Sequence, residues 1–133
     1  MVSAVSRLAV GTFGFLLAAT PVAAAAAGGQ SLFLDNCAAC HQPNGVGVAG
    51  AFPALKGSKV AQGDPKEPIT RVLKGRGGMP SFQSELTDLE IATVLTYVRS
   101  AWGNKAPPVQ PTQITALRGS GRRDNARASL LAH

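Results

Sequence analysis

Two cysteines and one histidine stand together in the segment Cys37-Ala38-Ala39-Cys40-His41, and the chain of 133 residues has no other cysteine. Thiols three positions apart on a helical turn can bond the two vinyl-derived carbons at one edge of a haem. The histidine that follows is then placed beside the iron as an axial ligand. This pattern is the attachment motif of c-type haem. The sequence therefore predicts one covalently bound haem c, tethered by Cys37 and Cys40 and ligated by His41.

Two other kinds of site use the same residue types. A C-x-x-C pair can serve as a thiol–disulfide redox centre, but such centres accompany a strand–helix–strand pattern that this sequence lacks. A structural zinc site needs four cysteine or histidine ligands. After Cys37, Cys40 and His41 only His133, the last residue, is left. Both alternatives therefore fit the sequence less well than haem attachment does.

A second axial ligand can be sought by elimination, because few donors remain. Met79 lies in the glycine-rich segment 75–80, where glycine lets the backbone approach a flat ligand and Pro80 stiffens the exit. Its nitrogen rival is His133. A thioether is a soft, neutral donor, and His/Met ligation raises the haem potential. The sequence predicts Met79 as the sixth ligand and Phe82 as an aromatic contact of the haem; the alternative is that Met79 only fills the core.

Composition gives a second reason to expect a prosthetic group. A length of 133 residues suffices for one small domain with its ends, which excludes a multidomain enzyme. Hydrophobic residues make up 45% of the chain, but they are unevenly spread and the first 27 residues are rich in alanine. A small domain with few large apolar side chains usually needs disulfides, a metal or another source of buried contact. Two cysteines cannot form a disulfide framework, so the composition predicts that a cofactor supplies part of the buried core.

Helices must position these residues, because the sequence shows no convincing strand. The clearest helix follows Thr87, which forms a capping box with Glu90. Its apolar residues repeat at helical spacing as far as Trp102, and Gly103-Asn104 ends it. Two further helices are predicted at residues 29–39 and 69–74. The expected fold class is all-α.

The first 27 residues are predicted to be a signal peptide. Arg7 is their only charged residue, and an apolar stretch covers residues 8–19. The small residues at 23–27 offer several A-x-A cleavage sites, among which the sequence does not choose. The alternative is an uncleaved membrane anchor, since residues 8–27 approach the roughly 20 residues that span a bilayer. In both cases the folded part is exported, so we expect it in the periplasm, either free or attached to the inner membrane.

The chain is basic, with 13 Lys and Arg against 7 Asp and Glu and a formal net charge of +6. We expect residues 28–109 to form the folded domain and residues 110–133 to form a basic, mostly flexible tail. The sequence allows a short helix near residues 111–117 but does not require one. The tail offers a contact for an acidic partner or for anionic lipid. It has no nucleic-acid motif with interleaved aromatic residues, so we predict no nucleic-acid partner.

Four segments occur in the order found in one known family: Gly29-x-x-x-Phe33-x-x-x-Cys37-x-x-Cys40-His41, Asn44-Gly45-x-Gly47-x-x-Gly50-x-Phe52-Pro53-x-Leu55, Gly78-Met79-Pro80-Ser81-Phe82, and Tyr97. With them the sequence resembles the class I cytochromes c, of the small exported bacterial kind, over about residues 29–104. The resemblance implies a cytochrome c domain at residues 28–109. It also implies three to five helices wrapped around one covalently attached haem.

The resemblance further implies roles for residues around the haem. The Pro53 carbonyl would accept a hydrogen bond from the His41 ring nitrogen that faces away from the iron, which orients the ring. Trp102 either lines the haem edge or closes the core. The basic tail has no counterpart in the family's minimal core. The residues expected to pack where the first and last helices cross are Gly29, Phe33 and Tyr97.

Two filled axial positions leave the iron no open site, so the expected function is single-electron transfer between Fe(II) and Fe(III) rather than catalysis. As an electron-transfer protein, the chain is either a free periplasmic carrier or a cytochrome subunit of a dehydrogenase or terminal oxidase complex. The remaining alternative is a haem enzyme or gas sensor, in which Met79 would be a labile ligand. The expected partners are a protein electron donor and acceptor, such as a dehydrogenase, a quinol-oxidising complex or a terminal oxidase. Basic residues near the ligand segments form either a steering rim or ordinary solvated surface. These residues are Lys56, Lys59, Arg71, Lys74 and Arg76.

Overall fold

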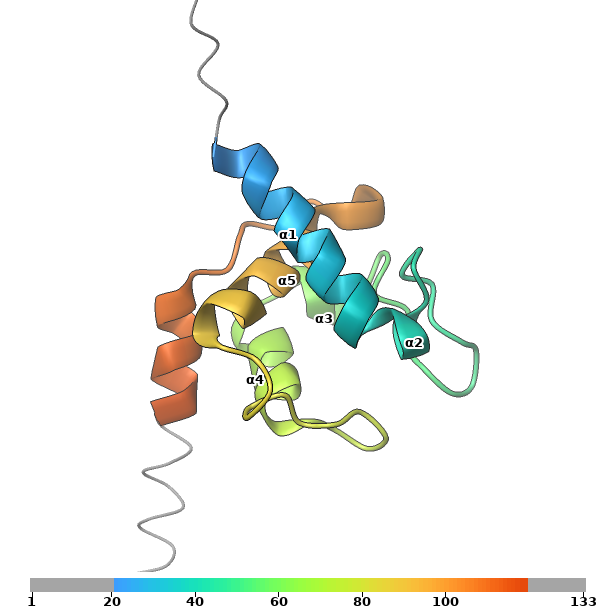
Figure 1. The fold of residues 1–133 in the computed structure, drawn as a ribbon. Coiled ribbons are helices and arrows are strands. Elements are labelled where there is room, and N and C mark those ends of the chain that lie inside the picture. The colour runs from blue at the N-terminus through green and yellow to red at the C-terminus, as the bar shows by residue number, and fades with distance from the viewer. Residues whose placement is uncertain (1–20, 120–133) are drawn as a thin grey trace, which may run out of the picture.

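The computed structural model describes residues 21–119, with side chains from residue 28 onward. Over this range the chain is helical and forms no strand, which confirms the all-α class (Figure 1). The elements are α1 (Pro21–Asn36), α2 (Ala38–His41), α3 (Lys59–Gln62), α4 (Lys66–Lys74), α5 (Asp88–Ser100), the 3₁₀ turn η1 (Ala101–Gly103) and a further helix over residues 111–119, called the C-terminal helix below. No helix in this part of the chain is long and apolar enough to cross a bilayer. Most of the predicted signal peptide, residues 1–20, lies outside the described residues, so its cleavage stays a prediction.

The first helix differs from the predicted range of 29–39. α1 begins at Pro21 and ends at Asn36, and Cys37 leaves helical geometry with φ −125° and ψ −33°. The chain then forms the single turn α2, in which the N–H groups of Cys40 and His41 both point to the Cys37 carbonyl at 3.2 and 3.0 Å. The break therefore falls at the first cysteine of the motif and sets the direction of the turn that carries the histidine.

α1 crosses α5 at close range (Figure 1). A Cβ atom at Gly29 would lie 2.7 Å from the Tyr97 Cβ and 2.8 Å from the Thr93 carbonyl oxygen, so glycine is needed for this approach. Phe33 is fully buried, and its ring centroid lies 5.7 Å from that of Tyr97. The expected packing of Gly29 and Phe33 against Tyr97 is confirmed.

α5 begins as predicted but ends earlier. The Thr87 hydroxyl accepts the Glu90 N–H at 3.3 Å, and the Glu90 carboxylate accepts the Thr87 N–H at 2.8 Å, so the capping box is present. The prediction that the helix runs through Trp102 is wrong, since the α-helix ends at Ser100 and Trp102 has φ +55°. This backbone turns the indole onto Phe33, with ring centroids 5.0 Å apart. The packing of the Trp102 ring on Phe33 therefore takes this residue out of the helix that its spacing predicted.

Two segments before α5 also differ from expectation. α4 begins at Lys66, three residues before the predicted range of 69–74, and ends where predicted. Pro68 fits inside its first turn because N–H groups there have no intrahelical partner. The single turn α3 was not predicted, since its surroundings read as an irregular loop. The Ser58 hydroxyl starts it by accepting the Ala61 N–H at 3.2 Å.

The buried apolar side chains form two clusters, and α5 contributes to both. The larger cluster joins α4, α5 and the C-terminal helix and consists of Ile69, Val72, Leu73, Leu86, Ile91, Ala92, Leu95, Val109 and Ile114. The smaller cluster joins α1, α2, α3 and α5 and consists of Phe33, Ala38, Ala61, Val94 and Val98. The core is therefore divided rather than continuous.

Part of the expected flexible tail, residues 110–133, is packed. Residues 111–119 are helical and Ile114 is fully buried, in the same cluster as Val109, the last residue of the predicted domain. The apolar residues of the tail are too few for a second core, but Ile114 completes the larger cluster already present. The rest of the tail, residues 120–133, lies outside the described residues.

Arg99 is a buried charge on α5 that joins three chain segments. It is 2% exposed and donates hydrogen bonds to the carbonyl oxygens of Ala61 (2.7 Å), Gly63 (3.0 Å) and Pro107 (2.8 Å). Burial lowers the pKa of the Arg99 guanidinium and Asp64 opposes this shift. An arginine remains charged in either case, so the three carbonyls share one charged donor.

Replacing Arg99 with methionine, which keeps most of the side-chain length, is expected to lower the free energy of unfolding by about 3 kcal/mol, because buried carbonyls lose a charged donor. Denaturant unfolding of the holoprotein measures this loss. The control is Lys105→Met at an exposed cation, for which we expect a change within about 0.5 kcal/mol. A loss for Arg99→Met as small as the control's would show that the three contacts contribute nothing.

Asp88, the first residue of α5, is held by the C-terminal helix. The Thr115 hydroxyl donates to its Oδ2 at 2.5 Å and the Arg118 Nε donates to its Oδ1 at 2.7 Å. The Thr115 hydrogen bond first, and then Arg118, hold the pKa of the Asp88 carboxyl below its ordinary value. A depressed pKa means that the carboxylate stabilises the fold above its unfolded pKa, and that this stabilisation is lost as the pH falls through the folded pKa.

We therefore expect Asp88→Asn to be less stable than the wild type by a constant amount above about pH 5, and expect this difference to shrink below about pH 4, where the carboxyl takes up its proton. Denaturant unfolding of both holoproteins at a series of pH values measures the difference. A difference that stays constant down to about pH 2 would contradict the assignment.

Candidate haem-binding site

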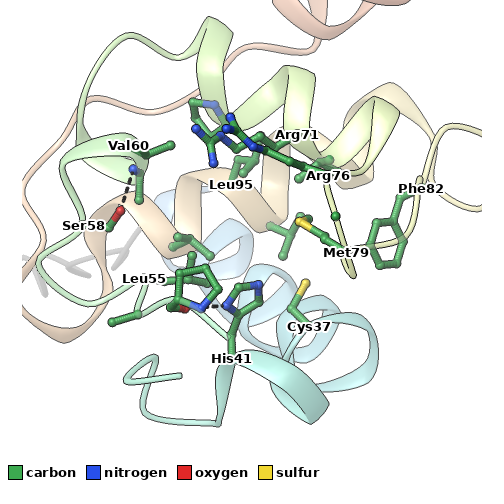
Figure 2. A pocket seen from close by; sticks show the side chains of 18 of the residues that line it. Cys37, His41, Leu55, Ser58, Val60, Arg71, Arg76, Met79, Phe82 and Leu95 are labelled. Atoms are coloured by element: carbon green, nitrogen blue, oxygen red, sulfur yellow. Dashed lines mark hydrogen bonds between the residues drawn. The ribbon is translucent and has the colours of Figure 1, made fainter. Parts of the chain in front are cut away.

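A pocket of about 400 Å³ opens between α2, α3, α4, α5 and the loops that connect them (Figure 2). Cys37, His41, Pro53, Met79 and Phe82 all line it, although they are spread over more than half of the predicted domain's sequence. Cys40 is half-buried and is not among the lining residues. The apolar walls come from both core clusters, through Ala61, Val72, Leu86, Val94, Leu95 and Val98.

His41 stands at one wall of the pocket, beside Cys37 (Figure 2). It is 9% exposed, and its Nδ1 lies 2.9 Å from the Pro53 carbonyl oxygen. A carbonyl only accepts, so Nδ1 carries the proton and Nε2 of the neutral ring keeps its lone pair. The hydrogen bond expected from the resemblance is present, and it leaves Nε2 free to act as a ligand.

The backbone at Pro53 approaches position 47 so closely that only glycine fits there. Gly47 has φ +65°, and a Cβ atom there would lie 2.3 Å from the Phe52 carbonyl oxygen and 2.7 Å from that of Pro53. The Gly47 N–H donates to the His41 carbonyl oxygen at 2.9 Å. One glycine thus joins the end of α2 to the backbone that orients the His41 ring.

Replacing Gly47 with alanine is expected to push the Pro53 carbonyl away from the His41 Nδ1 and to lower the free energy of unfolding by about 2 kcal/mol, because a side chain meets both the positive φ and the nearby carbonyls. Denaturant unfolding and the pH dependence of the haem absorption spectrum measure the two effects. Gly50→Ala is the control, because Gly50 also has a positive φ but a Cβ atom there would meet nothing within 4 Å. Equal effects of the two substitutions would show that the contact with Pro53 is unimportant.

Met79 lies on the wall opposite His41, in a loop fastened to α4 (Figure 2). Arg76 and Met79 exchange backbone hydrogen bonds of 3.0 Å each way. Gly75, which follows the last residue of α4, has φ +71°, and a Cβ atom there would lie 2.5 Å from the Met79 carbonyl oxygen. The Ser81 hydroxyl donates to the Leu73 carbonyl at 2.5 Å. The thioether side chain is therefore presented by a short, well-anchored loop.

Two arginines, Arg71 and Arg76, also line the pocket. The Nε of Arg71 is buried and has no hydrogen-bond partner, while its Nη2 lies 3.5 Å from a Glu67 carboxylate oxygen. A buried donor without a partner is costly, and the carboxylates of a haem are acceptors of the kind it lacks. The sequence placed both arginines among basic residues of undecided role, and the structure puts them at the site.

The residues of the pocket fit a haem. The walls are apolar, a thiol lies beside an imidazole with a free lone pair, and a thioether faces them. A buried guanidinium N–H without a partner, at Arg71, would suit an anionic group. Burial, and to a smaller extent the nearby Cys40, raise the pKa of the Cys37 thiol to about 11. At neutral pH the thiol is protonated and adds no charge to the apolar pocket.

Asn104 supports the site and was not predicted. It is 4% exposed, its Oδ1 accepts the Gly57 N–H at 2.9 Å, and its Nδ2 donates to the carbonyls of Leu55 (3.1 Å) and Val98 (2.7 Å). The loop that follows Pro53 is thereby tied to the end of α5. The sequence offers no periodic or motif signal for this role.

Trp102, for which two positions were open, packs in the core and is not among the pocket-lining residues. Its ring meets Phe33 and Tyr97 edge-on, at 5.0 and 5.5 Å between centroids. A Cβ atom at Gly45 would lie 2.5 Å from the indole, so this glycine admits the ring.

Comparison with known proteins gives consistent results. The family described as cytochrome c oxidase, cbb3-type, subunit III matches residues 24–98, more than half of the chain. The cytochrome c subunit of a quinone-dependent alcohol dehydrogenase from Gluconobacter oxydans is 35% identical over 106 residues, which are 70% of this chain and 22% of that protein. This chain therefore spans less than a quarter of that relative's length.

Smaller relatives are covered more fully. Cytochrome c6 from Leptolyngbya boryana is 44% identical over 76 residues, which are 56% of this chain and 88% of that protein. A cbb3-type cytochrome c oxidase subunit CcoP from Azospirillum brasilense is 34% identical over 90 residues, 62% of this chain and 30% of that protein. From the helical fold, the pocket and these matches it follows that the chain belongs to the cbb3-type subunit III family of c-type cytochromes, which carry covalently bound haem c and transfer electrons.

Proposed function

We propose that the chain is an exported electron carrier whose single haem is tethered by Cys37 and Cys40 and ligated by His41 and Met79. The observation that carries this proposal is the placement of His41 and Met79 on facing walls of one apolar pocket, with the Cys37 thiol beside the imidazole (Figure 2). Cys40 belongs to the proposal through the spacing of the motif rather than through the lining of the pocket.

When bound, the haem supplies a one-electron Fe(II)/Fe(III) couple. The chain's own residues then have three tasks. The Pro53 carbonyl holds the His41 ring in one orientation and one tautomer. The hydrogen bonds that anchor its loop hold the Met79 thioether on its wall of the pocket. The apolar walls, with Phe82 among them, exclude water, and Arg71 and Arg76 offer donors to carboxylates. Fixed ligand positions reduce the rearrangement that accompanies a change of charge.

We infer that the chain carries electrons and does not itself convert a substrate, because donor side chains occupy both facing walls of the pocket. We place it in the periplasm on the strength of the predicted signal peptide. Its proposed partners are a protein donor and a protein acceptor, such as a dehydrogenase, a quinol-oxidising complex or a terminal oxidase. The match to 88% of a cytochrome c6 supports a carrier that acts as a separate protein.

A second candidate is a subunit of an oxidoreductase complex. Relatives named as cytochrome c subunits of alcohol dehydrogenase and gluconate 2-dehydrogenase, and as a cbb3 oxidase subunit, favour it. Size-exclusion chromatography of the native protein from its own cells distinguishes the two: elution at the size of the single chain supports the carrier, and elution with a larger assembly supports the subunit.

The ligand assignment is tested on the full chain produced in a host that attaches c-type haem. We expect haem that stays on the denatured polypeptide, a reversible one-electron redox titration and a ferric sulfur-to-iron absorption band near the red end of the spectrum. Colourless, fully processed protein would refute the proposal. Rapid binding of carbon monoxide by the reduced wild-type protein would instead favour a haem enzyme or gas sensor with a labile Met79.

A further inference from the structure

The C-terminal helix, residues 111–119, lies beyond the family match, which ends at residue 98. It packs on the larger cluster through the fully buried Ile114. Met79 and Phe82 are partly buried and pack against that same cluster. An element outside the family's core therefore shares a packing surface with the segment that bears the proposed sixth ligand.

Arg118, on the C-terminal helix, forms hydrogen bonds with the backbone at the end of the segment that bears Met79. Arg118 donates from Nη2 to the Leu86 carbonyl oxygen at 3.0 Å and from Nη1 to the Gln83 carbonyl oxygen. Its Nε binds the Asp88 Oδ1 at 2.7 Å, and its side chain is 18% exposed. A single planar guanidinium thus joins two backbone carbonyls to the first turn of α5.

The guanidinium is itself held in place. The Thr115 hydroxyl, one turn earlier on the same helix, donates to the other oxygen of Asp88 at 2.5 Å. Both carboxylate oxygens are engaged by the C-terminal helix, which fixes the acid that Arg118 pairs with. Bonds from an ionised donor to carbonyl or carboxylate oxygens are stronger than those between neutral groups.

The segment from Met79 to Leu86 is consequently fastened at both ends. Its beginning is bound to α4, through Ser81 on the Leu73 carbonyl and through the Phe82 N–H on the Val72 carbonyl at 2.9 Å. Its end is bound by Arg118. Local opening of a loop is governed by the contacts that exist only in the closed form.

We propose that Arg118 is a positioning residue that keeps the Met79 segment closed, so that the C-terminal helix controls how often the thioether leaves its place. This inference rests on the proposed role of Met79 as a ligand. Arg118 touches neither the pocket nor Met79, and it acts through the backbone at residues 83–86. Removing it raises the population of the open loop and leaves the closed geometry unchanged.

The test uses the full-chain holoprotein and the rate at which its reduced form binds carbon monoxide, which requires an open sixth position. We expect Arg118→Ala to bind carbon monoxide about tenfold faster than the wild type or more, given the loss of charged hydrogen bonds. Arg118→Lys should bind carbon monoxide more slowly than Arg118→Ala but faster than the wild type, because the lysine cation can still reach one of the carbonyls. Lys105→Ala, which removes the same charge from an exposed side chain, should bind at the wild-type rate.

A double-mutant comparison isolates the route of the effect. In a Met79→Ala background, adding Arg118→Ala should not change the binding rate further, because the position is already open. An equal acceleration in both backgrounds, or a wild-type rate in Arg118→Ala, would overturn the inference. If the wild type itself bound carbon monoxide as fast as Met79→Ala, Met79 would not be a ligand. This comparison involves no Arg118 variant, so it tests the proposed function separately from the role of Arg118.

A milder substitution covers the case in which Arg118→Ala yields no holoprotein. Asp88→Asn removes the charge that faces Arg118 and keeps the size of the side chain. We expect it to accelerate carbon monoxide binding by a smaller factor than Arg118→Ala, about threefold. A wild-type rate for Asp88→Asn would count against the inference in the same way.

Discussion

Replacing His41 with alanine is expected to abolish the stable holoprotein. The pocket that His41 lines has a volume of about 400 Å³, and its walls belong to both core clusters. Without the haem, the apolar walls of the pocket stay exposed to water, at roughly 25 cal/mol for each Å² of apolar surface left unburied. A small domain has only about 5–15 kcal/mol of folding free energy to lose. The loss of the histidine ligand therefore threatens the fold as well as the redox centre.

The yield of covalently bound haem and the helical circular dichroism of the purified protein measure this effect. His133→Ala, the same substitution at the other histidine of the chain, is the control and should behave as the wild type. Cys37→Ala or Cys40→Ala should also reduce haem attachment, since each removes one tether. A His41→Ala protein without haem but with the helical signal of the wild type would show that the polypeptide folds unaided.

Replacing Met79 with alanine is expected to keep the haem attached and to change its properties. The tethers and the His41 side remain, so the protein should be red and folded. The neutral thioether favours the ferrous state, so we expect its loss to lower the reduction potential by on the order of 100 mV. The ferric sulfur-to-iron band should disappear, and the reduced protein should bind carbon monoxide rapidly.

Redox titration and absorption spectroscopy measure these changes. Val60→Ala is the control, because Val60 also lines the pocket but offers no donor atom. It should keep the band and most of the potential. A band that survives Met79→Ala unchanged would mean that another group ligates the iron, and His133 would be the next residue to replace.

The parts of the site that could be predicted are those whose chemistry is local in sequence. The spacing of Cys37, Cys40 and His41 points to one haem edge, and Met79 stands out as the lone internal methionine in a glycine-rich loop. The capping box at Thr87 is equally local. Each of these features depends on residues fewer than six positions apart, so it is determined by residues that are close together in the sequence.

The parts that could not be predicted depend on contacts between distant segments. Asn104 reaches the backbone of Leu55 and Gly57, and Arg99 reaches that of Ala61. Carbonyl and amide partners exist at every position, so no residue pattern marks the ones that are used. Trp102 leaves its helical spacing for the same reason, since its ring packs on an element far away in sequence.

The C-terminal helix illustrates a related difficulty. The apolar residues of this segment, Ile114 among them, are too few to suggest a core by themselves, and the surrounding arginines suggested a flexible tail. Ile114 is nevertheless fully buried, because it adds to a cluster that other elements have already built. The burial of an apolar residue depends on the surface it meets, and this surface is invisible in the residue's own segment.

The division of the core into two clusters has a consequence for the life of the newly made chain. Side chains of both clusters line the same pocket, so a chain without haem would leave that pocket open between them. We expect such a chain to be cut by proteases more readily than the holoprotein. A shortage of haem would then lower the amount of the chain itself, not only of its redox-active form.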